Sequence, residues 1–283
     1  MFENRKIAFI GPGVMAEAMI GGLIHQGVAK PEALIAAGPG LERLEQLAHK
    51  FAIAVTPDNA EAASQADVVV LSVKPQRLDK VLAGLHSAVS PATLVLSIVA
   101  GAPVIKIARG LGHESVVRSM PNTPAQIGEG ITVWTAASQV SEEQREMARQ
   151  ILSALGEEIF MEDENYLDMA TALSGTGPAY VFMFMEAMVD AGVHLGFPRR
   201  IAEQLVARTV RGSVDYYWDR DDPAHLARLR NQVTSPGGTT AEALYYLEKA
   251  GFRTAISRAI WAAYERSREL GAEARSHAPE KVE

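Results

Sequence analysis

Hydrophobic positions divide the chain into two parts with different periodicities. Up to Asp163, short apolar runs without polar alternation are separated by helical patterns. Parallel strands that are buried on both faces have such runs, because helices cover both sides of their sheet. We predict strands at Lys6–Ile10, Leu34–Ala37, Ile53–Val55, Val68–Val73, Leu94–Ile98 and Ser115–Arg118.

Helices between these strands, such as Met15–Gln26 and Leu41–Lys50, complete an alternation of strands and helices. This alternation is typical of right-handed βαβ units and a doubly wound parallel sheet. Two further runs, Ile131–Trp134 and Glu158–Met161, are expected to extend the edge of the sheet, with helix Glu142–Leu155 between them. Residues 1–162 are therefore predicted to form an α/β domain.

The second part has no convincing strand, and its apolar residues recur at helical spacing. The pattern includes Ile201, Leu205, Val206, Val210, Val214 and Tyr217, and glycines and prolines such as Gly175, Gly196, Pro198 and Pro223 interrupt it. We predict an all-helical domain over residues 163–283, with a polar and loosely ordered tail at Gly271–Glu283.

One predicted helix, Tyr180–Leu195, has large apolar side chains on most of its faces. Such a helix is buried on all sides, either in the centre of its own domain or against another subunit. Both interpretations fit the sequence.

Composition narrows the class of protein. The net charge of −7 argues against nucleic acid or an acidic membrane as partner. The chain has no cysteine, which excludes disulfides, thiolate nucleophiles and zinc–sulfur sites and suits a reducing compartment. No signal-peptide core follows Met1, and no run reaches the ~18 apolar residues of a membrane span. We therefore expect a cytoplasmic protein. We also expect no metal site, because no histidines have the spacing of metal ligands.

The first strand leads into a glycine-rich turn and a helix, Gly11-Pro12-Gly13-Val14-Met15-Ala16. This matches the G-x-G-x-x-A pattern of a dinucleotide site in a Rossmann-type domain. Gly11 allows the tight turn, Gly13 lets a pyrophosphate approach the backbone, and Ala16 permits close packing of the helix.

The cofactor is expected to be NADPH, with NADH possible. The second strand ends at Ala37-Gly38-Pro39-Gly40 without the carboxylate that binds the 2′-hydroxyl of NAD. Arg43 and Asn59 are candidates for contact with the ribose or its phosphate, and Arg43 could equally be a solvated helix residue. Other turns at the carboxyl edge of the sheet, Ser72–Pro75, Ala100-Gly101 and Met120–Pro124, should line one crevice.

A second candidate site lies far along the chain, at Thr234-Ser235-Pro236-Gly237-Gly238-Thr239-Thr240. Small residues that open a helix leave its first N–H groups bare, and the helix dipole favours an anion such as a carboxylate there. The alternative interpretation is an ordinary Ser/Thr cap.

Few side chains are candidates for strong acid–base chemistry. Lys74 is the sole lysine beside a predicted cofactor turn, and the helical part has only Lys249 and Lys281. The β-hydroxyacid dehydrogenases use a lysine near the start of a similar helical domain, and this chain has none. We therefore favour reduction of a protonated C=N bond, which needs only a weak donor.

With these motifs, the chain resembles the Δ1-pyrroline-5-carboxylate reductases, which catalyse the last step of proline biosynthesis. The resemblance rests on Gly11–Ala16, Val73-Lys74-Pro75, Met120–Pro124, Leu173–Tyr180 and Thr234–Thr240, and it runs from Ile7 to about Leu270. It implies reduction of pyrroline-5-carboxylate to L-proline by NAD(P)H. It also implies that the helical part is a dimerisation domain, with the substrate site at the interface of a homodimer. The resemblance leaves both a dimer and a ring of dimers open.

The resemblance also implies roles for individual residues. Cofactor binding falls to Gly11, Gly13, Val14, Met15, Asn59, Val73, Lys74, Pro75, Met120 and Asn122. Substrate binding falls to Ser235, Gly237, Gly238, Thr239 and Thr240, with Thr240 as the catalytic hydroxyl nearest the ring nitrogen. Gly38-Pro39-Gly40 departs from the serine, or asparagine with arginine, that the family often has there. A reductase of another cyclic imine and a non-catalytic dinucleotide-binding regulator remain the alternatives.

Overall fold

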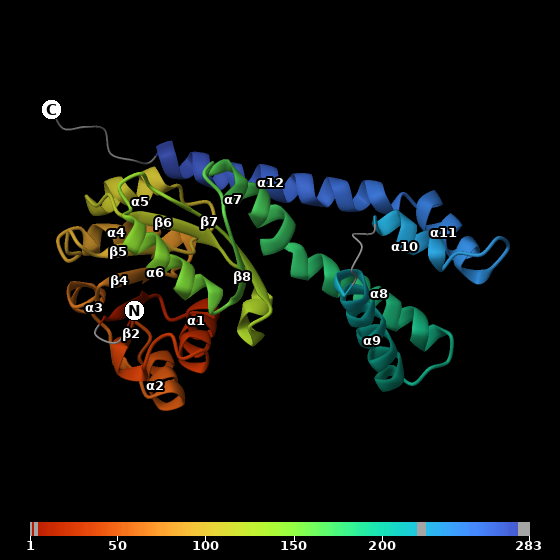
Figure 1. Ribbon diagram of the computed structural model, residues 1–283, viewed down its shortest axis with the longest axis horizontal. Coiled ribbons are helices and arrows are strands. Elements are labelled where there is room, and N and C mark those ends of the chain that lie inside the picture. The colour runs from red at the N-terminus through yellow and green to blue at the C-terminus, as the bar shows by residue number, and fades with distance from the viewer. Residues whose placement is uncertain (1, 3–4, 220–224, 277–283) are drawn as a thin grey trace. The chain divides into compact units, whose positions relative to one another are not determined.

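The computed structural model describes Phe2, residues 5–219 and residues 225–276, and these fall into two compact units (Figure 1). The first unit comprises the described residues up to Thr176 and those from Ala262 onward, and the second comprises Gly177–Trp261. The division into functional domains at residues 162 and 163 stays a prediction. Pro223 and residues 277–283 of the predicted tail lie outside the described residues.

The first unit is built on one sheet, which within the described residues has the strand order β3-β2-β1-β4-β5-β6-β7-β8. Its strands are β1 Ile7–Ile10, β2 Leu34–Ala37, β3 Ala54–Thr56, β4 Val68–Leu71, β5 Leu94–Ser97, β6 Val116–Met120, β7 Gly130–Ala136 and β8 Gly156–Phe160. Neighbouring strands from β3 to β6 are parallel, β7 is antiparallel to β6, and β8 is parallel to β7. The predicted doubly wound sheet and its two extra edge strands are confirmed.

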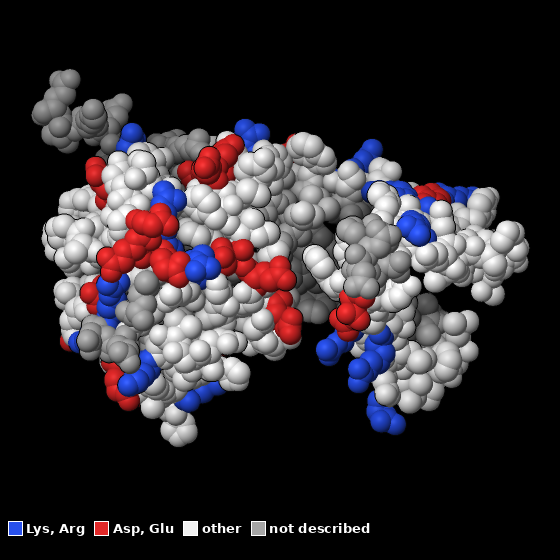
Figure 2. All heavy atoms as spheres, viewed as in Figure 1, with Lys and Arg blue, Asp and Glu red and all other residues white. Residues whose placement is uncertain are grey.

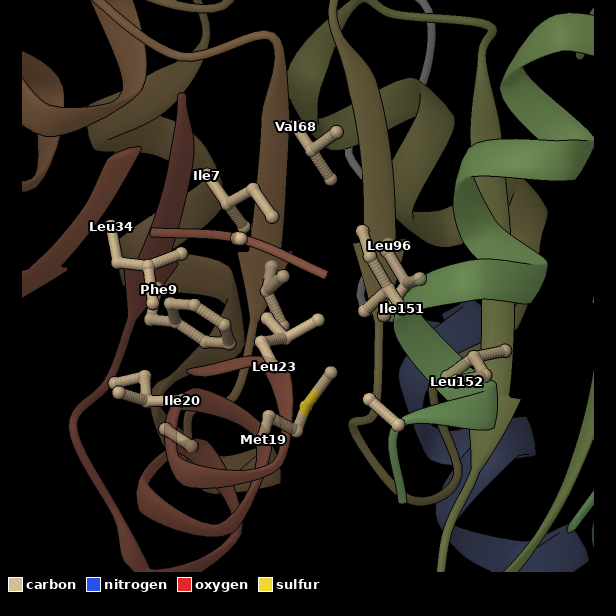
Figure 3. Close-up of a cluster of buried hydrophobic side chains, with 14 of the residues drawn as sticks. Ile7, Phe9, Met19, Ile20, Leu23, Leu34, Val68, Leu96, Ile151 and Leu152 are labelled. Atoms are coloured by element: carbon tan, nitrogen blue, oxygen red, sulfur yellow. The ribbon is translucent and has the colours of Figure 1, made fainter. Parts of the chain in front are cut away.

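Helices of the first unit connect these strands and cover the sheet. They are α1 Val14–His25, α2 Leu41–Phe51, α3 Asn59–Ser64, α4 Leu78–Leu85, α5 Val104–Leu111, α6 Glu142–Ser153 and α7 Asn165–Ala170. Buried side chains form two clusters because successive residues of the central strands point to opposite faces of the sheet. Figure 3 shows part of the larger cluster, in which Ile7 and Phe9 of β1 contribute beside Met19 and Leu23 of α1.

The second unit is helical throughout its described residues, as the sequence predicts. It contains α8 Gly177–His194, α9 Arg199–Trp218, α10 Leu226–Gln232, α11 Thr239–Lys249 and the first part of α12 Phe252–Ser276. Its buried cluster consists of Val189, Ala202 and Val206. No helix in the described part of the chain has the length and apolarity of a membrane span.

Helix α8 is not a central core helix of its own chain. Phe182 is 62% exposed and Met183 is 74% exposed, although both are large apolar side chains. The interpretation that this helix is buried in the centre of its own domain is therefore wrong. The interpretation that it is buried against another subunit stays a prediction.

The prediction of a loose tail from Gly271 is wrong for Gly271–Ser276, which belong to α12. This end of the helix packs on the turn after β5. Gly271 is buried, and a side chain on Gly101 would place its Cβ 2.8 Å from Cβ of Leu270. Because that contact involves backbone and apolar groups, the polar composition of the tail did not reveal it.

On the face shown in Figure 2, the charged side chains of the first unit do not form a basic surface. Over the described residues drawn there, acidic and basic groups are interspersed on the first unit. This agrees with the net charge of −7.

Candidate active site

The turn after β1 has the geometry that its glycines predict. Gly11 has φ +98°, and its N–H donates to the carbonyl of Ala37 at 2.9 Å. A Cβ on Gly11 would lie 2.6 Å from Cγ1 of Val73 and 2.9 Å from the Val73 nitrogen. Both the backbone conformation and the close approach of the next loop therefore require glycine here.

The start of α1 is open toward solvent. Gly13 is the N-cap residue, and no side chain caps the helix. The first hydrogen bond of the helix is donated by the N–H of Glu17 to the carbonyl of Gly13, at 3.0 Å. No atom lies within 4 Å of the position of a Gly13 Cβ. The N–H groups of Val14 and Met15 thus precede the first helical bond beside an open space. Val14 is 61% exposed, while Ala16 is fully buried against the core. This cradle fits a pyrophosphate.

The turn after β4 braces the glycine turn from the neighbouring strand. The Ser72 hydroxyl donates to the carbonyls of Gly11 at 2.8 Å and Ile10 at 3.1 Å. Val73 packs partly into the core, whereas Lys74 is exposed at the start of the short helical turn Pro75–Arg77. The structure therefore places Val73 directly beside Gly11.

Asn59 carries one of the two buried polar side-chain atoms without a hydrogen-bond partner among the described residues. It is the first residue of α3, and Asp58 rather than Asn59 caps that helix by accepting from Ala60 N–H at 2.8 Å. The buried orphan is Asn59 Oδ1. A buried acceptor without a donor is costly, and it marks a place where a ligand hydroxyl would be stabilised. The observation fits the predicted ribose contact.

The turn after β6 has a structural as well as a candidate binding role. Asn122 Oδ1 accepts the N–H of Ile131 at 3.0 Å and so holds the start of the neighbouring strand. Met120 contacts the π-helical turn Thr171–Gly175, since a Cβ on Gly175 would lie 2.8 Å from its Cε. Single π turns interrupt α-helices frequently at functional sites. Met120 and Asn122 thus lie at the carboxyl edge of the sheet, as predicted.

Arg43 lies against the glycine turn rather than free in solvent. Its Nε donates to the Pro12 carbonyl at 2.9 Å, and its Nη2 pairs with Glu17, which also accepts from Lys50 Nζ at 2.7 Å. Hydrogen bonds from Lys50 and then Arg43 lower the pKa of Glu17 below its ordinary value. The sequence analysis missed Glu17 and Lys50. Their meeting depends on how α1 and α2 lie side by side, which no local pattern reveals.

Gly38, where the chain departs from the family pattern, has a local packing reason. A Cβ on Gly38 would lie 2.6 Å from Cδ of Pro12. Pro12, in the turn after β1, therefore fits against the backbone because the residue after β2 is Gly38. The departure changes which side chains are available to a cofactor at this point and leaves the backbone cradle unchanged.

The segment between α10 and α11 forms a second open helix start, in the second unit. The N-cap residue of α11 is Gly238, with no side-chain cap, so an ordinary Ser/Thr cap is excluded. The first hydrogen bond of the helix is donated by the N–H of Glu242 to the carbonyl of Gly238, at 3.3 Å. The N–H groups of Thr239 and Thr240 precede this bond.

The glycines of this segment have different constraints. Gly237 has φ +68° with nothing within 4 Å of a Cβ, whereas a Cβ on Gly238 would lie 2.4 Å from Oγ of Ser235. Gly238 N–H donates to the Ser235 carbonyl at 3.1 Å, which folds the segment into a tight turn before the helix. The turn brings all five predicted substrate residues, Ser235, Gly237, Gly238, Thr239 and Thr240, into one exposed or half-buried stretch.

The predicted cofactor residues all belong to the first unit, and the predicted substrate residues all belong to the second. Each group is assembled within its own unit. No cluster of three or more His, Asp or Glu side chains that could hold a metal ion occurs among the described residues.

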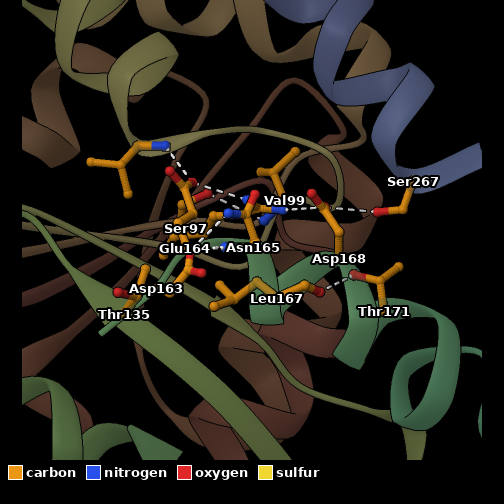
Figure 4. Close-up of polar contacts among 12 residues, drawn as sticks. Ser97, Val99, Thr135, Asp163, Glu164, Asn165, Leu167, Asp168, Thr171 and Ser267 are labelled. Atoms are coloured by element: carbon orange, nitrogen blue, oxygen red, sulfur yellow. Dashed lines mark hydrogen bonds and ion pairs between the residues drawn. The ribbon is translucent and has the colours of Figure 1, made fainter. Parts of the chain in front are cut away.

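A buried ionic network that the sequence analysis did not foresee lies behind the β6 turn (Figure 4). Arg118 of β6, 4% exposed, pairs through Nη1 with Glu164 and through Nη2 with Asp168, each at 2.9 Å. Asp168 also accepts from the Ser267 hydroxyl of α12 at 2.9 Å. An arginine inside a largely apolar strand is the sequence signal that could have revealed it, because a buried guanidinium requires carboxylate partners.

Comparison with known proteins gives matches over both parts of the chain. Residues 164–270 match the family model described as pyrroline-5-carboxylate reductase dimerisation, and residues 6–101 match one described as NADP oxidoreductase, coenzyme F420-dependent. A pyrroline-5-carboxylate reductase of Pseudomonas aeruginosa is 45% identical over 94% of this chain and 96% of its own length. One of Synechocystis is 42% identical over 94% and 98%. The crystal structure of a Plasmodium falciparum pyrroline carboxylate reductase with NADP bound is similar with a TM-score of 0.88 at 33% identity, over 96% of this chain and all of that one.

Proposed function

This chain belongs to the pyrroline-5-carboxylate reductase family, and we propose from the geometry of its two open helix starts how it binds and reduces its substrate. The protein is an NAD(P)H-dependent oxidoreductase of proline biosynthesis, and it uses NADP. The reaction reduces the C=N bond of Δ1-pyrroline-5-carboxylate to give L-proline. When bound, NADPH supplies the hydride.

We propose that the glycine turn and the start of α1 hold the pyrophosphate of the cofactor. Support comes from the space over Gly13 and from the uncapped N–H groups of Val14 and Met15. The unpaired Oδ1 of Asn59 would accept a ribose hydroxyl. Val73, Lys74 and Pro75, with Met120 and Asn122, would flank the nicotinamide, because they lie where β4 and β6 end, at the same edge of the sheet as the glycine turn.

The observation that carries the substrate proposal is the glycine-capped start of α11. Backbone N–H groups of Thr239 and Thr240 lie in the first turn of an 11-residue helix, where the dipole adds partial positive charge. A carboxylate accepts from such groups, and hydroxyls of Ser235 and Thr239 stand beside them. Gly237 and Gly238 allow the ligand to approach the backbone. Binding the carboxylate fixes the orientation of the pyrroline ring.

We propose Thr240 as the catalytic residue. Its hydroxyl, in the first turn of α11, would accept a hydrogen bond from the protonated nitrogen of the ring while the carboxylate is held by the same turn. A protonated C=N bond is already electrophilic, so this reaction requires positioning rather than a strong acid. The absence of a lysine near the start of the helical part is compatible with that requirement.

A homo-oligomer follows from the dimerisation family model, and we propose a homodimer formed through the helical part. The second unit buries a cluster of three apolar side chains and exposes many large ones, among them Phe182, Met183, Trp218, Tyr246 and Trp261. A core this small cannot stabilise the unit alone, and a second copy would cover the exposed side chains. Native mass spectrometry tests this, since a monomer at micromolar concentration would contradict it and would leave the reductase assignment untouched.

We further propose that the dimers can assemble into a ring and that the protein is cytoplasmic. Masses at higher multiples of the dimer in the same native spectra would support the ring, and a dimer alone at all concentrations would refute it. Cell fractionation checks the location.

The reaction itself is tested by the loss of NADPH absorbance, and then of NADH absorbance, on adding racemic pyrroline-5-carboxylate. Rapid oxidation of NADPH with formation of proline is expected. A six-membered cyclic imine carboxylate serves as the comparison substrate. Dinucleotide binding without oxidation by pyrroline-5-carboxylate, together with turnover of the other ring, would refute the assigned substrate and retain the class of reaction.

A further inference from the structure

The last part of helix α12 is docked on the first unit along one face. This helix begins in the second unit, and its residues from Ala262 onward belong to the first. Ser267 is 3% exposed and Gly271, one turn later, is buried, whereas Arg268 and Glu269 between them are exposed. Residues four positions apart lie on the same side of a helix. The segment Ser267–Gly271 therefore has a packed face and a solvent face.

The packed face meets the backbone of the turn after β5. Gly101 has φ +65°, and a Cβ on it would lie 2.8 Å from Cβ of Leu270 and 3.5 Å from the nitrogen of Gly271. In the other direction, a Cβ on Gly271 would lie 3.6 Å from the carbonyl oxygen of Gly101 and 3.9 Å from Cγ of Pro103. The helix and the turn are thus in contact through two glycines, with no side chain between their backbones at this point.

A chain of polar contacts joins the same segment of α12 to both neighbours of this turn. The Ser267 hydroxyl donates to Oδ1 of Asp168 at 2.9 Å (Figure 4). Asp168 also accepts from Nη2 of Arg118 in β6 at 2.9 Å, and Nη1 of Arg118 bonds to Glu164. The same oxygen of Glu164 accepts the N–H of Val104, the first residue of α5, at 2.8 Å. The two carboxylates therefore connect α12, β6 and the start of α5.

The turn after β5 lies between the two groups that are proposed to flank the nicotinamide. Strand β5 is parallel to β4 on one side and to β6 on the other, so its carboxyl end lies between Val73–Pro75 and Met120. The Ser119 hydroxyl donates to the carbonyl of Ser97 at 3.2 Å, which joins the end of β5 to the residue before Met120. A displacement of this turn would therefore displace the groups around the nicotinamide.

We propose that the segment Ser267–Gly271 holds the turn after β5 in the place that hydride transfer requires, and that Ser267 is a positioning residue for the reaction. Ser267 acts through Asp168 and through the contact of α12 with Gly101. The proposal rests on the cofactor placement of the proposed function. It assigns a role in the reaction to the end of a helix that contributes no residue to either open helix start.

Steady-state kinetics and NADPH titration of Ser267→Ala test the proposal. We expect kcat with pyrroline-5-carboxylate to fall about 5- to 50-fold, while the Kd for NADPH and the KM for the imine change by less than about twofold, because orientation rather than binding is lost. Deuterium at the transferred position of NADPH should slow kcat more in the variant than in the unaltered protein, since hydride transfer limits the rate more strongly. Ser267→Thr, which retains the hydroxyl, should keep more of the rate.

Thr93→Val is the matched control for the loss of a buried hydroxyl. Thr93 is 2% exposed and its hydroxyl donates to the carbonyl of Ala66 at 2.9 Å, at the amino end of β5 and so at the opposite edge of the sheet. This variant should lose stability without a fall in kcat. Equal falls in kcat in Ser267→Ala and Thr93→Val would show a general effect of stability and would overturn the proposal, and so would an unchanged kcat in Ser267→Ala.

Gly271→Val tests the same contact from the other side, because its methyl groups would reach the carbonyl of Gly101, and it should lower kcat more than Gly271→Ala does. The fluorescence lifetime of the nicotinamide in bound NADPH provides a measurement without turnover. It should shorten in Ser267→Ala and Gly271→Val, because a more mobile ring loses its excitation faster, and not in Thr93→Val. An unchanged lifetime in the first two variants would refute the positioning role. A protein that binds NADPH but does not reduce pyrroline-5-carboxylate still gives these lifetimes, so the two failures are distinguishable.

Discussion

Two glycines of the cofactor turn, Gly11 and Gly13, should differ in how alanine affects the stability of the protein. At Gly11 the added Cβ would lie 2.6 Å from a Val73 methyl, 2.9 Å from the Val73 nitrogen and 3.0 Å from the Ser72 carbonyl carbon. The methyl could rotate away, but the other two atoms are backbone. In addition, φ at Gly11 is +98°, which an L-residue rarely adopts.

The expected cost of Gly11→Ala follows from these two terms. Forcing an L-residue into positive φ costs about 1–2 kcal/mol, and overpacking against rigid neighbours costs about 1–3 kcal/mol. The free energy of unfolding should therefore fall by about 2–5 kcal/mol, and the Tm by roughly 4–20 °C. Weaker NADPH binding would accompany the loss of stability, because the turn itself is displaced.

Gly13→Ala should leave the fold intact and damage binding alone. Gly13 has φ −80° and ψ −174°, which alanine adopts freely, and no atom lies within 4 Å of the new Cβ. A smaller unfolded-state entropy and a poorer N-cap act in opposite directions, so stability should change by less than about 1 kcal/mol.

Thermal unfolding and fluorescence titration with NADPH measure both effects. For Gly13→Ala we expect an unchanged Tm and an NADPH affinity at least about tenfold lower, a loss of 1.4 kcal/mol or more. Unaltered NADPH binding by Gly13→Ala would refute the assignment of this space to the pyrophosphate. An unaltered Tm of Gly11→Ala would refute the steric argument.

Three further substitutions test other parts of the molecule. Thr240→Ala should lower kcat with pyrroline-5-carboxylate by about 10- to 150-fold, the effect of one hydrogen bond to a charged group, with an unchanged Kd for NADPH; weaker NADPH binding would contradict its role. Arg118→Met should lower the free energy of unfolding in urea by about 3–5 kcal/mol, because it leaves two partly buried carboxylates uncompensated, and an unchanged midpoint would show that the pairs are not needed. Hydrogen bonds from Lys50 and Arg43 lower the pKa of Glu17 below 4.5. The stability difference between the unaltered protein and Glu17→Gln should therefore be full above pH 4.5 and should vanish as the pH falls through the lowered pKa. A difference that persists at lower pH would contradict the pairing.

Much of the first unit could be predicted because its strands are short, buried and apolar on both faces. Val68–Leu71 contains only apolar residues, and Leu94–Ser97 is apolar except for its last residue. The glycine turn could be predicted because its conformation is determined locally, by positive φ at Gly11 and by an open N-cap at Gly13. The start of α11 was predicted for the same reason, since Gly237 and Gly238 constrain their own backbone.

Contacts between elements could not be predicted, and they include the charged groups that shape the cofactor site. Glu17 is a residue of α1, and Arg43 and Lys50 are residues of α2; only the packing of these two helices against each other brings the three side chains together. Arg118 pairs with Glu164 and Asp168, which lie 46 and 50 positions away in the chain, and Asp168 in turn accepts from Ser267, which is 99 positions further on.

For helix α8, the sequence predicts more burial than the structure of a single chain shows. Its sequence predicts burial, yet Phe182 and Met183 are exposed in a single chain. The apolar pattern records the environment of the assembled protein, because selection for solubility acts on the oligomer and not on an isolated chain. A sequence can therefore carry correct information about burial that one chain's structure alone would contradict. For this protein, the mismatch at α8 is itself an argument for the second copy, and it is independent of any similarity to known proteins.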